Sequence, residues 1–311
     1  MIVVEEIDLK DRFTPEIYYP TIEADWSRIE ELKKLHFVTV VDEIDAQVGD
    51  LVKANSPERT FSKQELSDEI RNYLPESEKE RFGNWVFYPW KNILVHILPE
   101  EDFIRVRTLR NNFKITPEEQ ARLREKRVGI VGLSVGQSVA LAIALERGCG
   151  EMRLADFDTL ELSNLNRLKA GVTSLGLEKV VIAAREISEI DPYLKVVLYR
   201  EGINADNVSD FLLKDGKLDL LIDECDSLDV KLMLREEARK ERIPVMMETS
   251  DRGMLDIERF DFEPERPIFH GLLEGVNANQ LKNLSNKERV AIVLKITGLE
   301  TLSLRMKASL L

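Results

Sequence analysis

The stretch that most restricts the fold of this chain lies near its middle and reads KRVGIVGLSVGQSVALAIALERGCGEMRLADFD. Residues 128–131 are apolar and β-branched or small, as is typical of a buried parallel strand. Gly132 and Gly136 then bracket a tight turn. A helix is expected over residues 137–147, and a second apolar strand over residues 152–155. The stretch therefore predicts a βαβ unit.

The second strand of this unit ends at an acid. Asp156 lies 24 residues past Gly132, close to the roughly 20 expected of a dinucleotide-binding unit. Backbone N–H groups at the helix N-terminus could hold a phosphate, while Asp156 accepts hydrogen bonds from a ribose. The alternative is a unit whose glycines serve only the turn, because the usual G-x-G-x-x-G would need glycines at Ser134 and Gln137.

Composition limits the classes of protein to consider. A chain of 311 residues with 43% hydrophobic and 32% charged residues is ordinary for a globular protein of about two domains. The formal charge of −13 argues against binding to nucleic acid or to an anionic membrane. The two cysteines exclude a zinc ribbon, and no run is apolar enough for a membrane span or a signal peptide. A cytoplasmic protein is expected.

Residues 1–107 are predicted to form a small α+β domain, whose role the sequence does not disclose. A helix is expected near residues 26–35 and a strand within residues 36–44. Ser62 followed three residues later by a glutamate predicts a capping box. A hairpin is expected within residues 84–98, where four aromatic residues favour packing over a binding surface.

Residues 108–311 show a different pattern. Thr116 and Ser285, each followed three residues later by a glutamate, are the expected N-caps of two further helices, and strands and helices alternate from residue 127 to residue 248. This alternation predicts a doubly wound, mostly parallel sheet with ligands at the carboxyl ends of its strands. The basic run at residues 105–114 is either a solvated linker or an arm that faces phosphate.

Several polar residues fall where a nucleotide site of such a sheet would lie: Asp156, Asp158, Ser163, Asn164, Arg167, Lys179 and Asp226. Their order resembles the adenylyltransferase family of ThiF, MoeB and HesA, which is related to the ubiquitin-activating enzymes. The family's hallmarks are an acid-x-acid strand end, a Ser-Asn-x-x-Arg, a Gly-x-x-Lys that opens the next helix, and a later aspartate. The resemblance covers roughly residues 107–262.

The resemblance implies roles for these residues. Asp156 would hold the ATP ribose, Arg167 and Lys179 would neutralise the triphosphate, and Asn164 would donate to phosphate oxygens. Asp226 would hold Mg²⁺, a cation that prefers carboxylate, water and phosphate oxygens. The family's reaction is the attack of a carboxylate on the α-phosphorus, which yields an acyl-adenylate and pyrophosphate.

Other parts of the implied site leave alternatives open. Gly132, Ser134 and Gly136 would form the phosphate loop, although this loop has less glycine than is usual in the family. Asp158 and Ser163 would also contact the nucleotide, or would serve only as local hydrogen-bonding residues.

The family also supplies an arginine from before the first strand, often from the partner subunit of a homodimer. Arg110 is the candidate, with Arg107 as the alternative. The chain lacks the thioester cysteine and the Cys-x-x-Cys pairs of many relatives, and Cys149 and Cys225 are expected to be buried packing residues. Some similar members continue into a nitroreductase-like domain.

Three functions are therefore weighed. The first is an ATP- and magnesium-dependent adenylyltransferase acting on a carboxylate of a peptide, a small protein or an amino acid. The second is a non-catalytic binding module that has kept the fold. The third is an NAD-dependent oxidoreductase, which would have no need of the Ser-Asn-x-x-Arg and of Lys179 at their spacing.

Overall fold

Two separate β-sheets organise the chain in the computed structural model, which describes residues 10–112, 114–249, 253–276, 278–281, 284–298 and 302–309. One unit comprises Met1–Ala121 with Arg185–Tyr193, and the other comprises Arg122–Ala184 with Leu194–Leu311. This division lies after Ala121, whereas the division drawn from the sequence lies after residue 107. The sequence-based boundary stays a prediction.

The first unit contains a four-stranded sheet in the order β1-β3-β4-β2. Only β2 and β4 run parallel, and the predicted hairpin is the antiparallel pair β3–β4. The strands are β1 (Glu16–Tyr18), β2 (Thr39–Asp42), β3 (Asn84–Tyr88) and β4 (Ile93–Ile97). The helices are α1 (Glu23–Lys34), α2 (Ile44–Asn55), α3 (Lys63–Tyr73) and α4 (Glu100–Arg107). Helix α5 (Pro117–Arg124) contains the division between the two units.

Local sequence signals explain how several of these elements form. Ser62 and Glu65 make the predicted capping box at the start of α3, which satisfies two helix N–H groups. Thr116 and Glu119 exchange the same pair of bonds, at 2.8 and 3.2 Å, before α5. The aromatic residues of the hairpin pack as expected, since Trp85 is only 1% exposed.

The basic run at residues 105–114 is not a solvated linker where the structure describes it. Helix α4 extends to Arg107, and a short 3-10 turn covers Leu109–Asn111. Arg107 donates to Asp191 at 3.0 Å, and the Asp191 side chain is fully buried. Arg107 therefore stabilises the first unit through an ion pair.

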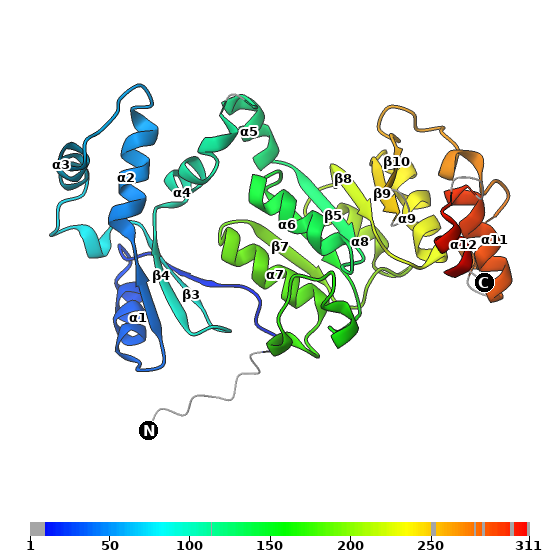
Figure 1. Ribbon diagram of the computed structural model, residues 1–311, viewed down its shortest axis with the longest axis horizontal. Helices are drawn as coiled ribbons and strands as arrows, with labels where there is room; N and C mark the ends of the chain where they lie inside the picture. Colours follow the sequence, from blue (N-terminus) through cyan, green and yellow to red (C-terminus); the bar gives the residue numbers. More distant parts are fainter. Residues whose placement is uncertain are drawn as a thin grey trace. The chain divides into compact units, whose positions relative to one another are not determined.

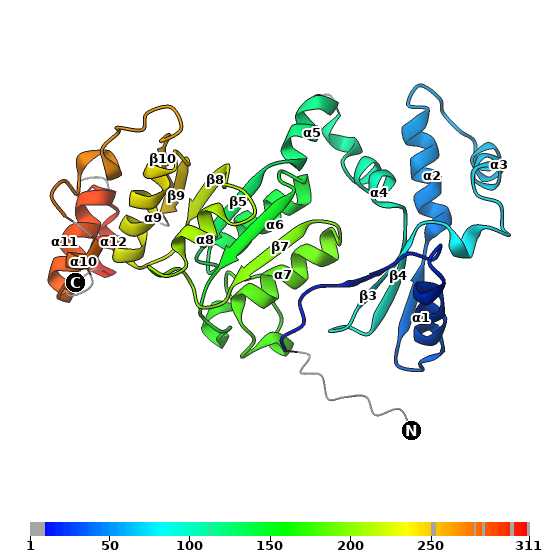
Figure 2. The ribbon, with the colours of Figure 1, turned by 180° about the vertical axis from the view of Figure 1, so that it is seen from behind.

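The second unit contains a six-stranded sheet in the order β10-β9-β8-β5-β6-β7 (Figures 1 and 2). All neighbouring pairs run parallel except β9 and β10. The strands are β5 (Arg127–Val131), β6 (Glu151–Ala155), β7 (Lys195–Tyr199), β8 (Leu220–Asp223), β9 (Val245–Thr249) and β10 (Met254–Glu258). The predicted doubly wound, mostly parallel sheet is confirmed.

Helices cover both faces of this sheet. A side chain at Gly129 of β5 would meet Phe211 of α8, whereas one at Gly136 would meet Ile130, the next residue along β5. Because successive residues of a strand point to opposite faces, α6 and α8 lie on opposite faces. The helices are α6 (Gly136–Glu146), α7 (Lys179–Ile190), α8 (Val208–Leu213) and α9 (Leu228–Lys240). The part of α7 from Arg185 onward is assigned to the first unit.

In the part of the chain that the structure describes, three α-helices follow the last strand, and the first of them packs against α9 (Figure 1). They are α10 (Ala278–Leu281), α11 (Asn286–Thr297) and α12 (Leu304–Ser309). Ser285 and Glu288 form the third predicted capping box, at the start of α11. Leu232 and Met247 share an apolar cluster with Ile292 and Ile296 of α11. Among the described residues, no helix has both the length and the hydrophobicity to span a membrane.

Candidate nucleotide site

The loop that joins β5 to α6 approaches the end of β8 closely. Gly132 has a φ of +87°, and a Cβ there would lie 2.5 Å from the carbonyl oxygen of Glu224. Only glycine tolerates both conditions. Helix α6 begins at Gly136, and no side chain caps its N-terminus. This end of the sheet therefore offers backbone N–H groups and a partial positive charge to an anion.

Asp156 follows β6 and joins the β5–α6 loop to the end of β6 by hydrogen bonds. Its Oδ2 accepts from the Leu133 N–H at 2.6 Å, and its Oδ1 accepts from the Asp158 N–H at 2.8 Å. Burial raises the pKa of Asp156, while these N–H groups and Lys179 oppose the shift. A carboxylate has about four acceptor positions, so Asp156 can still accept from ribose hydroxyls.

Lys179 brings a cation to the same loop. It is the first residue of α7, as predicted, and its side chain is 5% exposed. Its Nζ donates to Ser134 Oγ at 3.1 Å and to Asp158 Oδ2 at 2.7 Å. Three predicted residues thus meet in one cluster. Asp158 holds the ammonium, which is a more specific contact than capping a turn.

The Ser-Asn-x-x-Arg segment is less closely joined to this cluster. Asn164 is buried, and its Oδ1 accepts from the Glu161 N–H at 2.9 Å, which closes a short 3-10 turn. Arg167 and Ser163 are exposed. Arg167 donates to the Ser163 carbonyl at 3.5 Å and to Asn166 Oδ1 at 3.0 Å. No carboxylate of the described residues pairs with Arg167, so its guanidinium is available to a phosphate.

A cavity connects the loop to the ends of the strands. It is lined by Gly132 and Ser134, by Asp156 and Asp158, and by the segment from Glu224 to Ser227. Asp226, the predicted magnesium ligand, is exposed. It forms no ion pair with any residue in the described ranges. A single free carboxylate fits Mg²⁺, which usually binds through one or two carboxylates together with water and phosphate oxygens.

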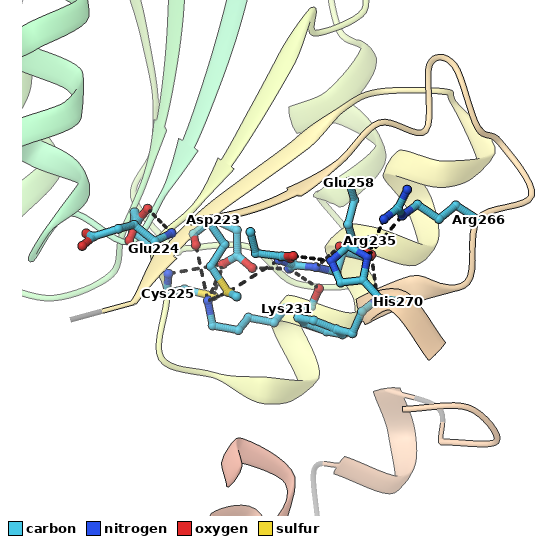
Figure 3. A network of polar contacts seen from close by, with 12 residues as sticks. Asp223, Glu224, Cys225, Lys231, Arg235, Glu258, Arg266 and His270 are labelled. Carbon is cyan, nitrogen blue, oxygen red and sulfur yellow. Dashed lines mark hydrogen bonds and ion pairs between the residues drawn. The ribbon is translucent and has the colours of Figure 1, made fainter. Parts of the chain in front are cut away.

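A buried acid that the sequence motifs do not mark precedes Asp226. Asp223 is fully buried at the end of β8, where Lys231 donates to it at 3.1 Å and Arg235 forms a second ion pair (Figure 3). Burial raises the pKa of Asp223, but attraction to Lys231 and Arg235 outweighs this and lowers it to about 2. Arg235 also donates to Glu258 at 2.6 Å. The signal available in the sequence was the unusual run Asp223-Glu-Cys-Asp226.

The pKa of the neighbouring Glu224 carboxyl is shifted in the opposite direction from that of Asp223. Burial raises its pKa to about 7, although the Glu248 N–H donates to it at 3.1 Å. Glu224 lies at the edge of the network in Figure 3 and contributes to two cavities.

Neither cysteine has the environment of a nucleophile. Cys149 is buried. The Cys225 thiol donates to Asp223 Oδ1 at 3.1 Å, and burial together with this anion raises its pKa well above the usual range. Reactive cysteines instead have a lowered pKa near positive charge.

Arg110 is exposed and belongs to the first unit. Its predicted contact with the nucleotide therefore stays a prediction.

Comparisons with known proteins show which family this chain belongs to. The profile of the ThiF family matches residues 108–299. An uncharacterized protein of Mycobacterium tuberculosis is 49% identical over 245 residues, which cover 78% of this chain and 34% of that protein. The molybdopterin-synthase adenylyltransferase of Haemophilus influenzae is 26% identical over 184 residues, which cover 58% of this chain and 73% of the enzyme.

Among solved structures, the Escherichia coli tRNA N6-threonylcarbamoyladenosine dehydratase TcdA in complex with ATP aligns at 25% identity. The alignment covers 47% of this chain and 60% of that chain, with a TM-score of 0.44. The family profile spans more than half of the chain. The chain therefore belongs to the ThiF family.

Proposed function

We propose that this chain is an ATP- and magnesium-dependent adenylyltransferase that activates a carboxylate as an acyl-adenylate. The observation that carries the proposal is the cluster at the glycine loop. There the Lys179 ammonium lies 3.1 Å from Ser134 Oγ, next to the uncapped N-terminus of α6. Two independent sources of positive charge thus serve one anion-binding loop.

The relatives support a nucleotide as the anion. One relative is named an adenylyltransferase, and another, from Bacillus subtilis, is a tRNA threonylcarbamoyladenosine dehydratase that is 29% identical over 153 residues. Asp156 stands where a ribose would meet the end of the second strand. The substrate would be a peptide, a small protein or an amino acid that offers a free carboxylate.

The proposed reaction needs positioning and charge more than proton transfer. A carboxylate is already an anion at neutral pH, so no general base is required for its attack. Its oxygen bonds to the α-phosphorus while the bond from that phosphorus to the bridging oxygen breaks, and pyrophosphate leaves. Lys179, Arg167 and the loop N–H groups would stabilise the charge that accumulates on the phosphate oxygens.

Asp226 would hold the magnesium ion, and the ion would supply charge neutralisation for the departing pyrophosphate. The environment of Cys225 does not favour a thioester, since its pKa is raised. The acyl-adenylate would therefore pass directly to an acceptor. We further propose a homodimer in which Arg110 of each chain serves the site of the other.

The test is a calorimetric titration of the protein with magnesium-ATP and, in parallel, with NADH. The variant Lys179→Ala should lose ATP binding, because the ammonium at the loop is removed. The matched control is Lys240→Ala, which removes an exposed lysine that pairs with Glu237 on the same helix. This control should bind ATP normally.

The other possible results would each contradict a part of the proposal. Binding of NADH without ATP would overturn the proposal in favour of an oxidoreductase. Binding of neither would favour a non-catalytic module, a reading that the glycine-poor loop supports. Equal ATP affinity in Lys179→Ala and Lys240→Ala would refute the role of Lys179.

A further inference from the structure

A second cavity adjoins the nucleotide cavity on the side of the C-terminal helices. The two share Glu224, Cys225 and Asp226 as lining residues. The second cavity has a volume of about 260 Å³, below the roughly 300–1,000 Å³ of pockets for drug-sized ligands. It can therefore enclose a group of the size of one amino acid.

The inner wall of this cavity is apolar. Helix α9 and strand β9 contribute Leu228 and Met247, and α11 contributes Val293 and Ile296. Leu302 lines it as well and is 6% exposed. An aliphatic side chain placed here would gain the usual free energy of leaving water.

The polar side chains of the cavity are mostly acidic. Glu224, Asp226 and Glu248 line it, and none of the three forms an ion pair with a described residue. Lys231 is the only basic residue among the described residues that line the cavity, and its ammonium is already engaged. It donates to Asp223 Oδ1 at 3.1 Å and to the Asp223 carbonyl at 3.3 Å, and it lies 3.3 Å from Met247 Sδ (Figure 3).

This distribution of charge selects among carboxylate substrates. If Asp226 is used for Mg²⁺, Glu224 and Glu248 still face the cavity without a cation. Glu224 is half-buried and Glu248 is exposed, and an ammonium group placed between the apolar wall and these side chains would form charge-assisted hydrogen bonds with their carboxylates. The reacting carboxylate must point the other way, toward Asp226 and the nucleotide cavity.

We propose that the second cavity binds the acyl part of the substrate, and that this substrate is a free α-amino acid with an apolar side chain. Its side chain fills the space between α9, β9 and α11, and its ammonium group meets Glu224 and Glu248. Its carboxylate oxygen forms the bond to the α-phosphorus of ATP, and pyrophosphate is released. This inference rests on the proposed adenylyltransferase function and names its substrate class.

The experiment is amino-acid-dependent exchange of labelled pyrophosphate into ATP, measured on the full chain. The probes are L-leucine, L-valine, L-methionine and L-phenylalanine. Glycine tests the apolar wall, 4-methylpentanoate tests the ammonium contact, and the tripeptide Gly-Gly-Leu moves the ammonium away from the carboxylate.

We expect at least one of the four apolar amino acids to support exchange with a kcat/KM at least about tenfold above that of glycine. The kcat/KM for L-leucine should exceed that for 4-methylpentanoate by roughly tenfold or more, because 4-methylpentanoate has no ammonium group and cannot form the charge-assisted hydrogen bond. Glu248→Gln should reduce this second ratio. Equal rates with L-leucine and 4-methylpentanoate, or a higher rate with the tripeptide, would overturn the proposal.

A pair of tryptophan variants tests the location. Ile296→Trp fills the cavity and should abolish exchange while magnesium-ATP binding persists. Lys295→Trp places the same residue at the adjacent exposed position of α11 and should leave exchange unchanged. Normal exchange in a folded Ile296→Trp protein would overturn the location. If that variant does not fold, the location is tested instead by whether Glu248→Gln lowers the ratio of kcat/KM for L-leucine to that for 4-methylpentanoate.

Failure of this inference differs from failure of the proposed function. A wild-type chain that binds magnesium-ATP but exchanges with none of the four amino acids refutes the substrate class alone. A chain that does not bind ATP refutes both.

Discussion

Four consecutive residues, which begin with the last residue of β8, have sharply different environments at the scale of single side chains. Asp223 is fully buried among cations, Glu224 is half-buried, the Cys225 thiol donates to Asp223, and Asp226 is exposed. The pKa is lowered to about 2 for Asp223 and raised to about 7 for Glu224. One short segment therefore holds a structural anion next to the proposed metal ligand.

Asp226→Ala should abolish magnesium-dependent pyrophosphate exchange without unfolding the chain, because Asp226 is exposed and forms no ion pair with a described residue. Exchange at several magnesium concentrations, with circular dichroism as the folding control, measures this. Unchanged exchange would show that another residue holds the ion.

Asp223→Asn should instead destabilise the protein, because it leaves Lys231 without its buried anion and removes one of the two buried anions that pair with Arg235. Removing one partner of a buried pair costs roughly 3–5 kcal/mol, and Glu258 limits the loss here by retaining its bond to Arg235. Urea unfolding measures the difference. The control is Asp206→Asn at an exposed position, and equal losses in both variants would contradict the assignment.

The difference in the free energy of unfolding should depend on pH, because the pKa of Asp223 is lower in the folded than in the unfolded chain. The unfolded pKa of an aspartate is about 3.9, above the folded value of about 2. The stabilisation by Asp223 is therefore complete above about pH 4 and is lost as the pH falls toward 2. The difference in the free energy of unfolding between wild type and Asp223→Asn should therefore decrease as the pH falls over this interval.

Cys225→Ser should retain magnesium-ATP binding and exchange, because a thiol with a raised pKa is a poor nucleophile. The native chain should also react with iodoacetamide at pH 8 roughly tenfold more slowly, or slower still, than the unfolded chain. Loss of exchange in Cys225→Ser, or rapid alkylation of Cys225, would restore a thioester mechanism.

At the scale of elements, the glycine loop depends on a contact with the end of β8. Gly132 and Gly176 both have positive φ, at +87° and +81°, but only a Cβ at Gly132 would meet another atom within 4 Å. The two positions therefore separate backbone strain from steric overlap.

Gly176→Ala should cost about 1 kcal/mol from its φ alone. Gly132→Ala should lower the free energy of unfolding by a further 1–3 kcal/mol, roughly, because the backbone at the end of β8 must move. It should also weaken ATP binding. Unfolding midpoints and calorimetry measure both. Equal stability of the two variants would mean that the close approach has no energetic weight.

At the scale of the whole molecule, the proposed dimer makes a prediction about complementation. Arg110→Ala and Lys179→Ala should each be inactive, but their mixture should regain exchange, since a mixed dimer contains one site with both residues intact. Light scattering should show a dimer. A monomer, or subunit exchange without recovery, would contradict the contribution of Arg110 in trans.

The local sequence was sufficient for much of the architecture. The apolar runs, the glycines at 132 and 136 and the capping residues Ser62, Thr116 and Ser285 predicted elements that the structure confirms. Each of these signals acts over a few residues, through backbone conformation or one hydrogen bond. The position of Lys179 at the start of α7 was instead implied by the family resemblance.

Only the tertiary structure decided how distant residues combine. The contact of Lys179 with Ser134 joins positions 45 residues apart, and the bond between Arg235 and Glu258 joins positions 23 apart. The acidic cavity likewise needs α11 to pack against α9 and β9. Burial and charge pairing depend on such contacts. The sequence therefore determined the fold and the family, whereas the structure decided which acids are buried and which face a ligand.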